Sequence, residues 1–218
     1  MTNYLSLKDH VYNFIQEKVN DGTLSPNEKI SEQMICEKLE ISRTPVREAL
    51  IQLATEGYLE KLPRRGFIVK PIDEKKAKEL YTLIGTLDSL AAFLSMDFIT
   101  TEDISIMERK VNDIDEAISK EDYELYNKLQ TEFHNVYINK CDNEELIRVV
   151  NQLRRNFIKH SYSMDENNRE KSIYEILKKT NTEHKTIIDL FKSKNKQELE
   201  NYIKNVHWDI SLASLEKL

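Results

Sequence analysis

Proline and glycine are scarce and unevenly distributed in this 218-residue chain. All four prolines and three of the four glycines fall within the first 71 residues, so that only Gly85 interrupts the rest. Because these residues mark turns and helix ends, a turn-rich N-terminal part is expected to precede a long helical part. The boundary is expected near Pro71, which predicts domains of residues 1–72 and 73–218.

Other absences exclude several classes of protein. The two cysteines, Cys36 and Cys141, are too few for a disulfide framework. No apolar run approaches the roughly 18 residues of a membrane span, and the polar first residues lack the apolar segment of a signal peptide. Hydrophobic residues make up 39% of the sequence, which is enough for packed cores. These features predict a cytoplasmic, globular protein.

Basic residues are concentrated in one segment of an acidic chain. The formal net charge is −6, yet residues 42–72 hold six Lys or Arg against three Glu. Basic residues on a small domain are often only solvated. Their concentration in one segment nevertheless indicates contact with a polyanion such as DNA.

The first 72 residues predict three helices and a hairpin. Apolar residues recur at helical spacing over residues 7–19, and Ser31 can cap a second helix. A third helix is expected over residues 42–57, followed by two strands, 58–62 and 67–70, around a tight turn. The apolar residues expected along the second and third helices are Met34, Ile35, Leu39, Val46, Ala49, Leu50, Leu53 and Ala54. This order predicts a winged helix-turn-helix domain.

Four arginines occupy the two places where such a fold contacts DNA. Arg43 and Arg47 lie near the start of the third helix, off its apolar stripe, and Arg64 and Arg65 lie at the hairpin tip. A recognition helix enters the major groove by its N-terminal end, while a wing contacts the minor groove or phosphates. The predicted DNA-binding residues are Arg43, Thr44, Arg47, Arg64, Arg65 and Gly66.

The string SRTPVREAL with a following RRGFIV resembles the DNA-binding domain of GntR-family bacterial transcription regulators. This resemblance implies a homodimer that binds double-stranded operator DNA with inverted half-sites. It also implies base and phosphate contacts from Arg43, Thr44, Arg47 and the wing tip at Arg65-Gly66. Glu40 stands in a turn where the family often has Gly, so a strained or shifted turn is expected.

Residues 73–218 predict an all-helical domain, because no alternating strand pattern interrupts their helical periodicity. The expected helical stretches are 73–98, 102–118, 122–140, 143–163, 170–192 and 196–216. The first of them carries a stripe of Leu80, Leu83, Leu87, Leu90, Ala91 and Leu94. A helical bundle of this length resembles the FCD effector domain of the fatty-acid-regulator branch, which implies a dimerising, ligand-binding domain. The α/β and aminotransferase-like effector domains of other branches do not match.

Four histidines lie in different predicted helices of the bundle: His134, His160, His184 and His207. Spacing alone favours scattered packing or surface residues, although a bundle can bring such residues together. The segments TEFHNVY, TEHKTIID and IKNVHWD resemble FCD metal-binding segments, which implies that His134, His184 and His207 bind one divalent metal ion. Zinc or nickel is expected, since imidazole suits both ions. His160 has no such match.

Two positions depart from the FCD pattern. Gln130 stands where the family resemblance implies an Asp ligand, and Ile84 stands where it implies an Arg that meets a ligand carboxylate. Because an amide oxygen is a poorer ligand than a carboxylate, weaker metal binding is expected, with Gln130 as a possible fourth ligand. A small organic acid or related metabolite is the expected effector, and the residues that bind it are not identified by the sequence.

Two functions are consistent with these features. The preferred one is a ligand-responsive transcription regulator without enzymatic activity, in which a metabolite bound in the bundle changes the spacing of two winged helices. The alternative is a DNA-tethered metalloenzyme with three histidines around an open metal position. The sequence marks no nucleophile, base or acid pair near these histidines, which favours the regulator.

Overall fold

The computed structural model describes residues 6–20, 23–24, 27–70, 74–158 and 170–210. The chain forms two compact units, Met1–Ile72 and Asp73–Leu218. Pro71, where the domain boundary is expected, lies outside the described residues. None of the helices in the described ranges is both long and apolar enough to cross a membrane.

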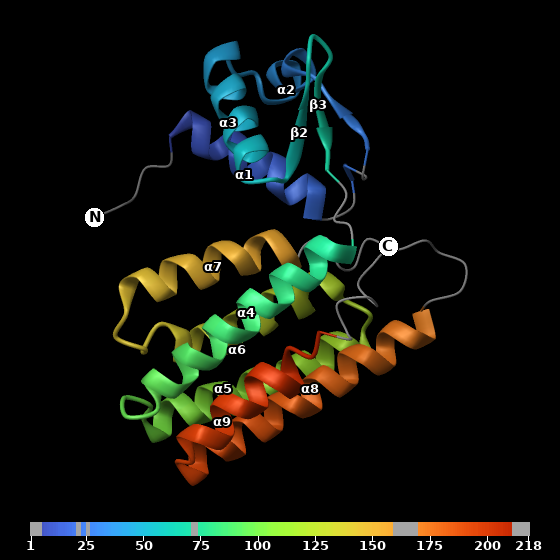
Figure 1. The fold of residues 1–218 in the computed structure, drawn as a ribbon. Helices are drawn as coiled ribbons and strands as arrows, with labels where there is room; N and C mark the ends of the chain where they lie inside the picture. Colours follow the sequence, from blue (N-terminus) through green and yellow to red (C-terminus); the bar gives the residue numbers. More distant parts are fainter. Residues whose placement is uncertain (1–5, 21–22, 25–26, 71–73, 159–169, 211–218) are drawn as a thin grey trace. The chain divides into compact units, whose positions relative to one another are not determined.

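The first unit is a winged helix-turn-helix (Figure 1). Its elements are α1 (Leu7–Asn20), β1 (Lys29–Ile30), α2 (Glu32–Leu39), α3 (Arg43–Thr55), β2 (Leu59–Leu62) and β3 (Gly66–Val69). The three strands form an antiparallel sheet in the order β1-β3-β2. The predicted helices and hairpin are confirmed. The sequence did not predict β1, because a strand of two residues is too short to produce an alternating pattern.

The turn between α2 and α3 contains the strain that the sequence predicts. Ser31 caps α2 by accepting a hydrogen bond from the Met34 N–H at 3.1 Å. At the other end of α2, Glu40 adopts a left-handed conformation with φ of 55°. A non-glycine residue in this region costs roughly 1–2 kcal/mol, so the helix-turn-helix is held in place by packing elsewhere.

That packing is a single apolar core beneath the three helices and the sheet. Its buried side chains include Val11, Ile15, Ile30, Ile35, Val46, Leu50, Leu53, Tyr58, Phe67 and Val69. Met34, predicted as part of the apolar stripe, is exposed instead, because α2 contacts the core through Ile35, Cys36 and Leu39.

Gly66, at the start of β3, is required by the backbone geometry of the wing. Gly66 has φ of 87°, and a Cβ at this position would lie 2.8 Å from the backbone oxygen of Ile30. Because a side chain here would be both strained and in collision, the close pairing of β1 with β3 requires glycine. The fold therefore requires glycine at this position independently of the predicted contact between Gly66 and DNA.

The second unit is an all-helical bundle, as predicted, and its described residues contain no strand. Its elements are α4 (Glu74–Ser95), α5 (Thr101–Ser119), α6 (Tyr123–Ile138), α7 (Glu144–Ile158), α8 (Glu170–Ser193), α9 (Lys196–Tyr202) and η1 (Ile203–His207). The long helix α4 packs against α6, α7, α9 and η1, while α5 packs against α6 and α8 (Figure 1).

The last helix differs from the predicted stretch 196–216. Its α-helical part ends at Tyr202, and the chain continues as the π-helical turn η1, closed by a hydrogen bond from the Trp208 N–H to the Ile203 oxygen at 3.0 Å. The wider turn leaves two consecutive side chains, His207 and Trp208, buried in the bundle. Such π turns often occur at functional sites. Residues beyond 210 lie outside the described ranges.

The buried face of α4 also differs from the predicted leucine stripe. Leu80 and Ala91 of that stripe are buried, but Leu83 and Leu90 are 51% and 37% exposed. Ile84 and Asp88, which lie outside the predicted stripe, are fully buried instead. Apolar spacing alone could not distinguish the face that packs in the core from an apolar face that remains on the surface.

Gly85 allows α4 to approach the end of η1 closely. A Cβ at this position would lie 2.7 Å from the Trp208 Cβ. We predict that Gly85→Ala lowers the free energy of unfolding by about 1–3 kcal/mol through overpacking. In the exposed interior of a helix, the same change would instead raise the free energy of unfolding by roughly 1 kcal/mol. A loss of stability would therefore indicate the close contact between residue 85 and Trp208.

Denaturant unfolding followed by the fluorescence of Trp208, the one tryptophan of the chain, measures this effect. Thr86→Ala is the matched control, because Thr86 is the exposed neighbour on the same helix and is expected to tolerate alanine. A Gly85→Ala variant that is more stable than the wild type would contradict the close contact.

Candidate functional site

The predicted DNA-binding side chains all lie on the surface of the first unit. Arg43 and Thr44 lie in the first turn of α3, Arg47 lies one turn later, and Arg64 and Arg65 lie in the turn between β2 and β3. Ser42 precedes α3 without a side-chain capping hydrogen bond. The first amide groups of α3 are therefore available to an anion such as a phosphate group.

Arg47 has an acidic partner that the sequence did not reveal. Its Nε and Nη2 donate to the two carboxylate oxygens of Glu32, both at 2.8 Å, and these hydrogen bonds hold the pKa of Glu32 below its usual range. The Arg47 side chain is 60% exposed. Exposed pairs of this kind contribute only about 0–1 kcal/mol, so Arg47 can leave Glu32 for another anionic partner at low cost.

Three of the predicted histidines meet inside the second unit. His134 comes from α6, His184 from α8 and His207 from η1, and all three are buried. One ring nitrogen from each lies within 4.8 Å of the others, an arrangement that could hold a metal ion. His160 lies outside the described residues.

Asp88 on α4 orients the first of these rings. The Nδ1 of His134 lies 2.9 Å from the Asp88 Oδ2 and 2.6 Å from the Tyr137 hydroxyl. Tyr137 donates to the other oxygen of Asp88 at 2.9 Å, and the Trp208 Nε1 donates to Oδ2 at 2.7 Å. Since the carboxylate can only accept, the Nδ1 of His134 carries the proton.

The other two rings are oriented in the same way. The Nδ1 of His207 lies 3.1 Å from the Glu183 Oε2, and the Nδ1 of His184 lies 3.2 Å from the Asn181 Oδ1. The Asn181 amide group donates to the Val111 oxygen at 2.9 Å and to Asp115 at 2.7 Å. These two bonds turn the Asn181 oxygen toward His184, so both Nδ1 atoms are donors.

Each histidine therefore directs an unprotonated Nε2 to the centre of the cluster. The Nε2 atoms of His134 and His207 are 3.2 Å apart, and the His184 Nε2 is buried without a hydrogen-bond partner. Two lone pairs at this separation repel each other unless a cation lies between them. Zinc ligands about 2.0–2.1 Å from one ion are separated by about 3.3 Å in tetrahedral geometry. The residues present thus fit a metal ion, with acceptors behind each imidazole as metal sites require.

Burial favours the neutral form of the His134 and His184 imidazoles, which is the form that binds metals. It lowers the pKa of His134 to about 4, against the opposing attraction of Asp88, and it lowers the pKa of His184 well below the usual value. Burial alone would raise the pKa of Asp88. His134, Arg154 and the hydrogen bonds to its oxygens nevertheless hold the pKa below its usual range, so Asp88 is a carboxylate.

Gln130 lies one helical turn before His134 on α6, in the position where the family resemblance implies an Asp ligand. Its side chain is buried, and its Oε1 has no hydrogen-bond partner. A buried acceptor without a donor needs explanation, and a metal ion would satisfy it. An amide oxygen is a weaker ligand than a carboxylate.

The sequence did not identify the residues that orient the histidines or the buried Arg154 nearby. Asp88 offered one detectable signal, since a charged residue stands among the small and apolar residues Ile84, Ala91 and Ala92 of α4. Asn181 and Glu183 offered none, because both are polar residues near His184 on a helix rich in polar residues.

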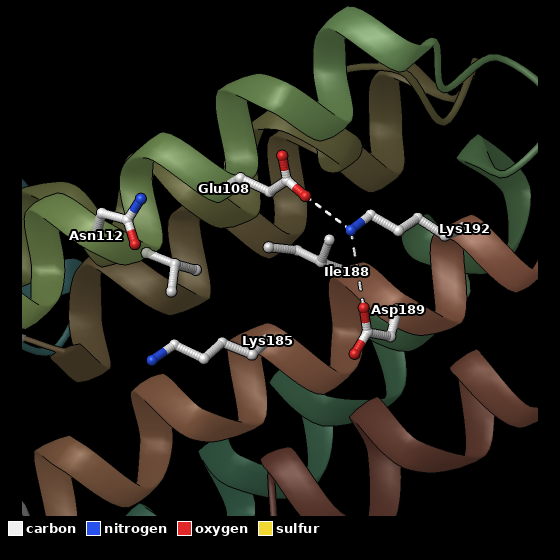
Figure 2. Close-up of a pocket in the computed structure, with 7 residues that line it drawn as sticks. Glu108, Asn112, Lys185, Ile188, Asp189 and Lys192 are labelled. Carbon is white, nitrogen blue, oxygen red and sulfur yellow. Dashed lines mark hydrogen bonds and ion pairs between the residues drawn. The ribbon is translucent and has the colours of Figure 1, made fainter.

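A groove between α5 and α8 is a separate feature of the bundle surface (Figure 2). Lys192 pairs there with Glu108 at 2.7 Å and with Asp189 at 3.8 Å, and Lys185 pairs with Asp115 at 2.9 Å. These ion pairs are exposed and satisfied by one another. The groove therefore has the properties of a solvated surface.

Comparisons with known proteins agree with both units. Residues 7–69 match the model of the bacterial regulatory proteins of the gntR family, and residues 79–206 match the FCD domain. The chain is 28% identical over 197 residues to the HTH-type transcriptional regulator YdhC of Bacillus subtilis (strain 168), covering 88% of this chain and 84% of the relative. The Nta operon transcriptional regulator of Aminobacter aminovorans is 32% identical over 128 residues, which is 59% of this chain and 60% of the relative.

Solved structures show the same fold. The E. coli McbR/YncC structure aligns with a TM-score of 0.80 at 20% identity, covering 97% of this chain and 98% of that chain. A GntR regulator from Rhodococcus sp. RHA1 aligns with a TM-score of 0.74 at 20% identity, covering 94% and 97%. With a gntR-type DNA-binding domain followed by an FCD domain across more than half of its length, the chain belongs to the GntR family of transcriptional regulators, in its FCD branch.

Proposed function

We propose that this protein is a homodimeric, cytoplasmic transcription regulator whose FCD domain binds a divalent metal ion and a small organic effector. The observation that carries the proposal is the histidine cluster. Three buried imidazoles are held with their Nε2 atoms together by acceptors from α4 and α8. Burying imidazoles and carboxylates costs folding free energy that an apolar core would not require. Binding of a metal ion would explain why the bundle contains these buried polar groups.

The DNA-binding surface consists of the first turns of α3 and the tip of the wing. Arg43 and Arg47 can reach base edges in the major groove, and Thr44 can bind a phosphate. Arg64, Arg65 and Gly66 can lie along the minor groove or the phosphate backbone. Their exposure on the first unit supports this assignment.

The exposed apolar residues of α4 support assembly into a homodimer. Leu83 and Leu90 lie on the surface face of α4, and Phe98 follows the helix with 52% of its side chain exposed. Exposed apolar patches mark interaction surfaces, and a twofold axis presents the same patch from both copies. A dimer places two winged helices on the inverted half-sites of one operator.

Metal and effector act through the helix that follows the wing. A bound divalent ion would supply a Lewis-acid position for one oxygen of the effector. Asp88 links the histidine cluster to α4, and residues 70–73 join α4 to β3 in the chain. An effector that changes the position of α4 therefore acts on the segment that carries the DNA-binding unit.

The alternative of a DNA-tethered metalloenzyme has less support. The relatives that match this chain are named as transcriptional regulators. The groups behind the histidines are also engaged in orienting them, since Asp88 and Glu183 each accept from an imidazole. A carboxylate in that role is not free to act as a general base.

The DNA-binding surface is tested by three arginine variants. We predict that Arg43→Ala and Arg47→Ala each weaken binding to an operator selected from random duplexes by about 1–3 kcal/mol and relax base preference. Arg64→Ala should weaken binding evenly across sequences and lower the salt slope by about one. Fluorescence anisotropy at several salt concentrations measures both effects. Arg148→Ala, an exposed arginine of the other unit, is the control. Unchanged affinity in both α3 variants, with native circular dichroism, would remove the major-groove assignment.

Dimerisation is tested on the exposed face of α4. We predict that the double variant Leu83→Asp/Leu90→Asp sediments as a monomer, because carboxylates cannot be buried unpaired in an interface. Its helix content should be unchanged and its operator affinity should fall at least tenfold. Leu125→Asp, at a comparably exposed leucine of α6, should remain dimeric. A wild-type protein that is monomeric both alone and on operator DNA would refute the assembly.

Metal binding is tested by elemental analysis of protein purified without chelator. We predict that His184→Ala abolishes metal retention and lowers the unfolding temperature, since binding to the folded state alone is stabilising. Gln130→Asp should tighten retention by supplying a carboxylate. His10→Ala, at an exposed histidine, should change neither. Less than about a tenth of an equivalent of metal in the wild type, with no thermal shift on adding zinc or nickel, would sink the metal site.

A further inference from the structure

His184 on α8 is held differently from the other two histidines of the cluster. The Nδ1 atoms of His134 and His207 each face a buried carboxylate. The Nδ1 of His184 instead lies 3.2 Å from the neutral amide oxygen of Asn181. Phe133 packs on the His184 ring with the ring centroids 4.3 Å apart. Because an apolar neighbour cannot select between the two nitrogen atoms of an imidazole, the tautomer of His184 depends, among the described residues, on Asn181.

The orientation of the Asn181 amide group is fixed by two acceptors on α5. Asn181 is fully buried, and its Nδ2 donates to the Val111 oxygen at 2.9 Å and to the Asp115 Oδ1 at 2.7 Å. Both N–H bonds of the amide group are therefore used. A reversed amide group would direct its oxygen at these two acceptors and its Nδ2 at His184. The observed orientation makes the Nδ1 of His184 the donor and leaves its Nε2 unprotonated.

Asp115 supplies a negative charge behind His184 from the surface of the bundle. Its side chain is 43% exposed, and its Oδ2 pairs with Lys185 at 2.9 Å. The other two histidines already have buried carboxylates behind them, and a third one in place of Asn181 would add the cost of burying another charge. An amide group between Asp115 and His184 avoids this cost. It also transmits the polarisation, since hydrogen bonds in a chain strengthen one another.

We propose that Asn181 and Asp115 are positioning residues for the metal ion, which fix His184 in the tautomer that carries its proton on Nδ1. Asn181 acts through its oxygen, and Asp115 acts through Asn181. The zinc affinity of a buried site therefore depends on a half-exposed carboxylate of α5, beside the groove that Lys185 lines (Figure 2). Because the metal ion belongs to the proposed function, the assignment rests on that proposal.

The first test measures the zinc affinity of the full chain by competition with a chromophoric chelator. We expect Asn181→Leu, which keeps a similar volume but has no acceptor, to weaken zinc binding by roughly ten- to a hundredfold, as the loss of a group that orients a ligating histidine does. Asp115→Ala should weaken it by at least about threefold, a smaller effect because the bond from Asn181 to Val111 remains. Since Asp115 lies at the surface, this variant tests the proposal even if Asn181→Leu does not fold.

Two control variants separate this role from that of an ion pair between α5 and α8. Lys185→Met removes the partner of Asp115 but leaves its bond to Asn181, so zinc affinity should be that of the wild type. Glu108→Ala breaks the neighbouring pair with Lys192, which also joins α5 to α8, and should likewise change nothing. A loss of zinc affinity in Lys185→Met equal to that in Asp115→Ala would assign the effect to the ion pair and overturn the role of Asp115.

A second measurement determines the tautomer of His184 in the absence of metal. NMR of isotope-labelled histidines in the chelator-treated full chain distinguishes protonated from unprotonated ring nitrogens. The signals of His184 are identified by their loss in His184→Ala. The wild type should carry the His184 proton on Nδ1, and Asn181→Leu should move it to Nε2 or populate both forms.

Two further results would overturn the assignment. The first is an Asn181→Leu or Asp115→Ala variant that binds zinc with wild-type affinity. The second is a wild type in which the proton of His184 lies on Nε2 when the metal is absent. A wild type that binds no zinc would instead refute the proposed metal site, and the tautomer of His184 in that protein would still decide the positioning role of Asn181.

Discussion

The buried carboxylate of Asp88 is the constraint on which the organisation of the helical unit depends. An ionised group with no exposed surface is tolerated only when donors surround it, and here they come from Tyr137 and His134 on α6 and from Trp208 after η1. Hydrogen bonds to a charged group contribute roughly 1.5–3 kcal/mol each. One residue therefore fixes three elements relative to one another and sets the tautomer of a candidate metal ligand.

Most of the fold could be predicted because its elements are defined by local signals. Helical periodicity, the Ser31 cap and the glycines of the first unit locate the winged helix, and the helical unit follows from uninterrupted periodicity. The errors arise where distant parts of the chain decide the structure. The leucines of α4 have the spacing of a core stripe, yet Leu83 and Leu90 are exposed because α7, α9 and η1 cover the opposite side. The π-helical turn at Ile203–His207 likewise leaves no pattern in the sequence.

The candidate site was predictable to a smaller extent. Family-like segments identify the three histidines, but they do not identify what makes these rings suitable for a metal. Asp88 is 46 positions before His134 in the sequence, and only the packing of α4 on α6 brings their side chains within 2.9 Å. Arg154 was missed for the same reason, since its position on α7 gives no sign that its guanidinium is buried and has unsatisfied N–H groups.

Ile84 and Gln130, the two positions that depart from the FCD pattern, can be compared with the charged groups that surround the histidines. The family resemblance implies a cation at the first position and an anion at the second, and this chain replaces both with uncharged residues. Ile84 is fully buried one turn before Asp88, where a guanidinium would compete with the donors of that carboxylate. Arg154 supplies a cation to the same interior from α7, and Asp88 and Glu183 supply anions behind the imidazoles. Although Ile84 and Gln130 are uncharged, charged groups of both signs therefore stand around the histidines, and the electrostatics of the site come from Asp88 on α4, Glu183 on α8 and Arg154 on α7.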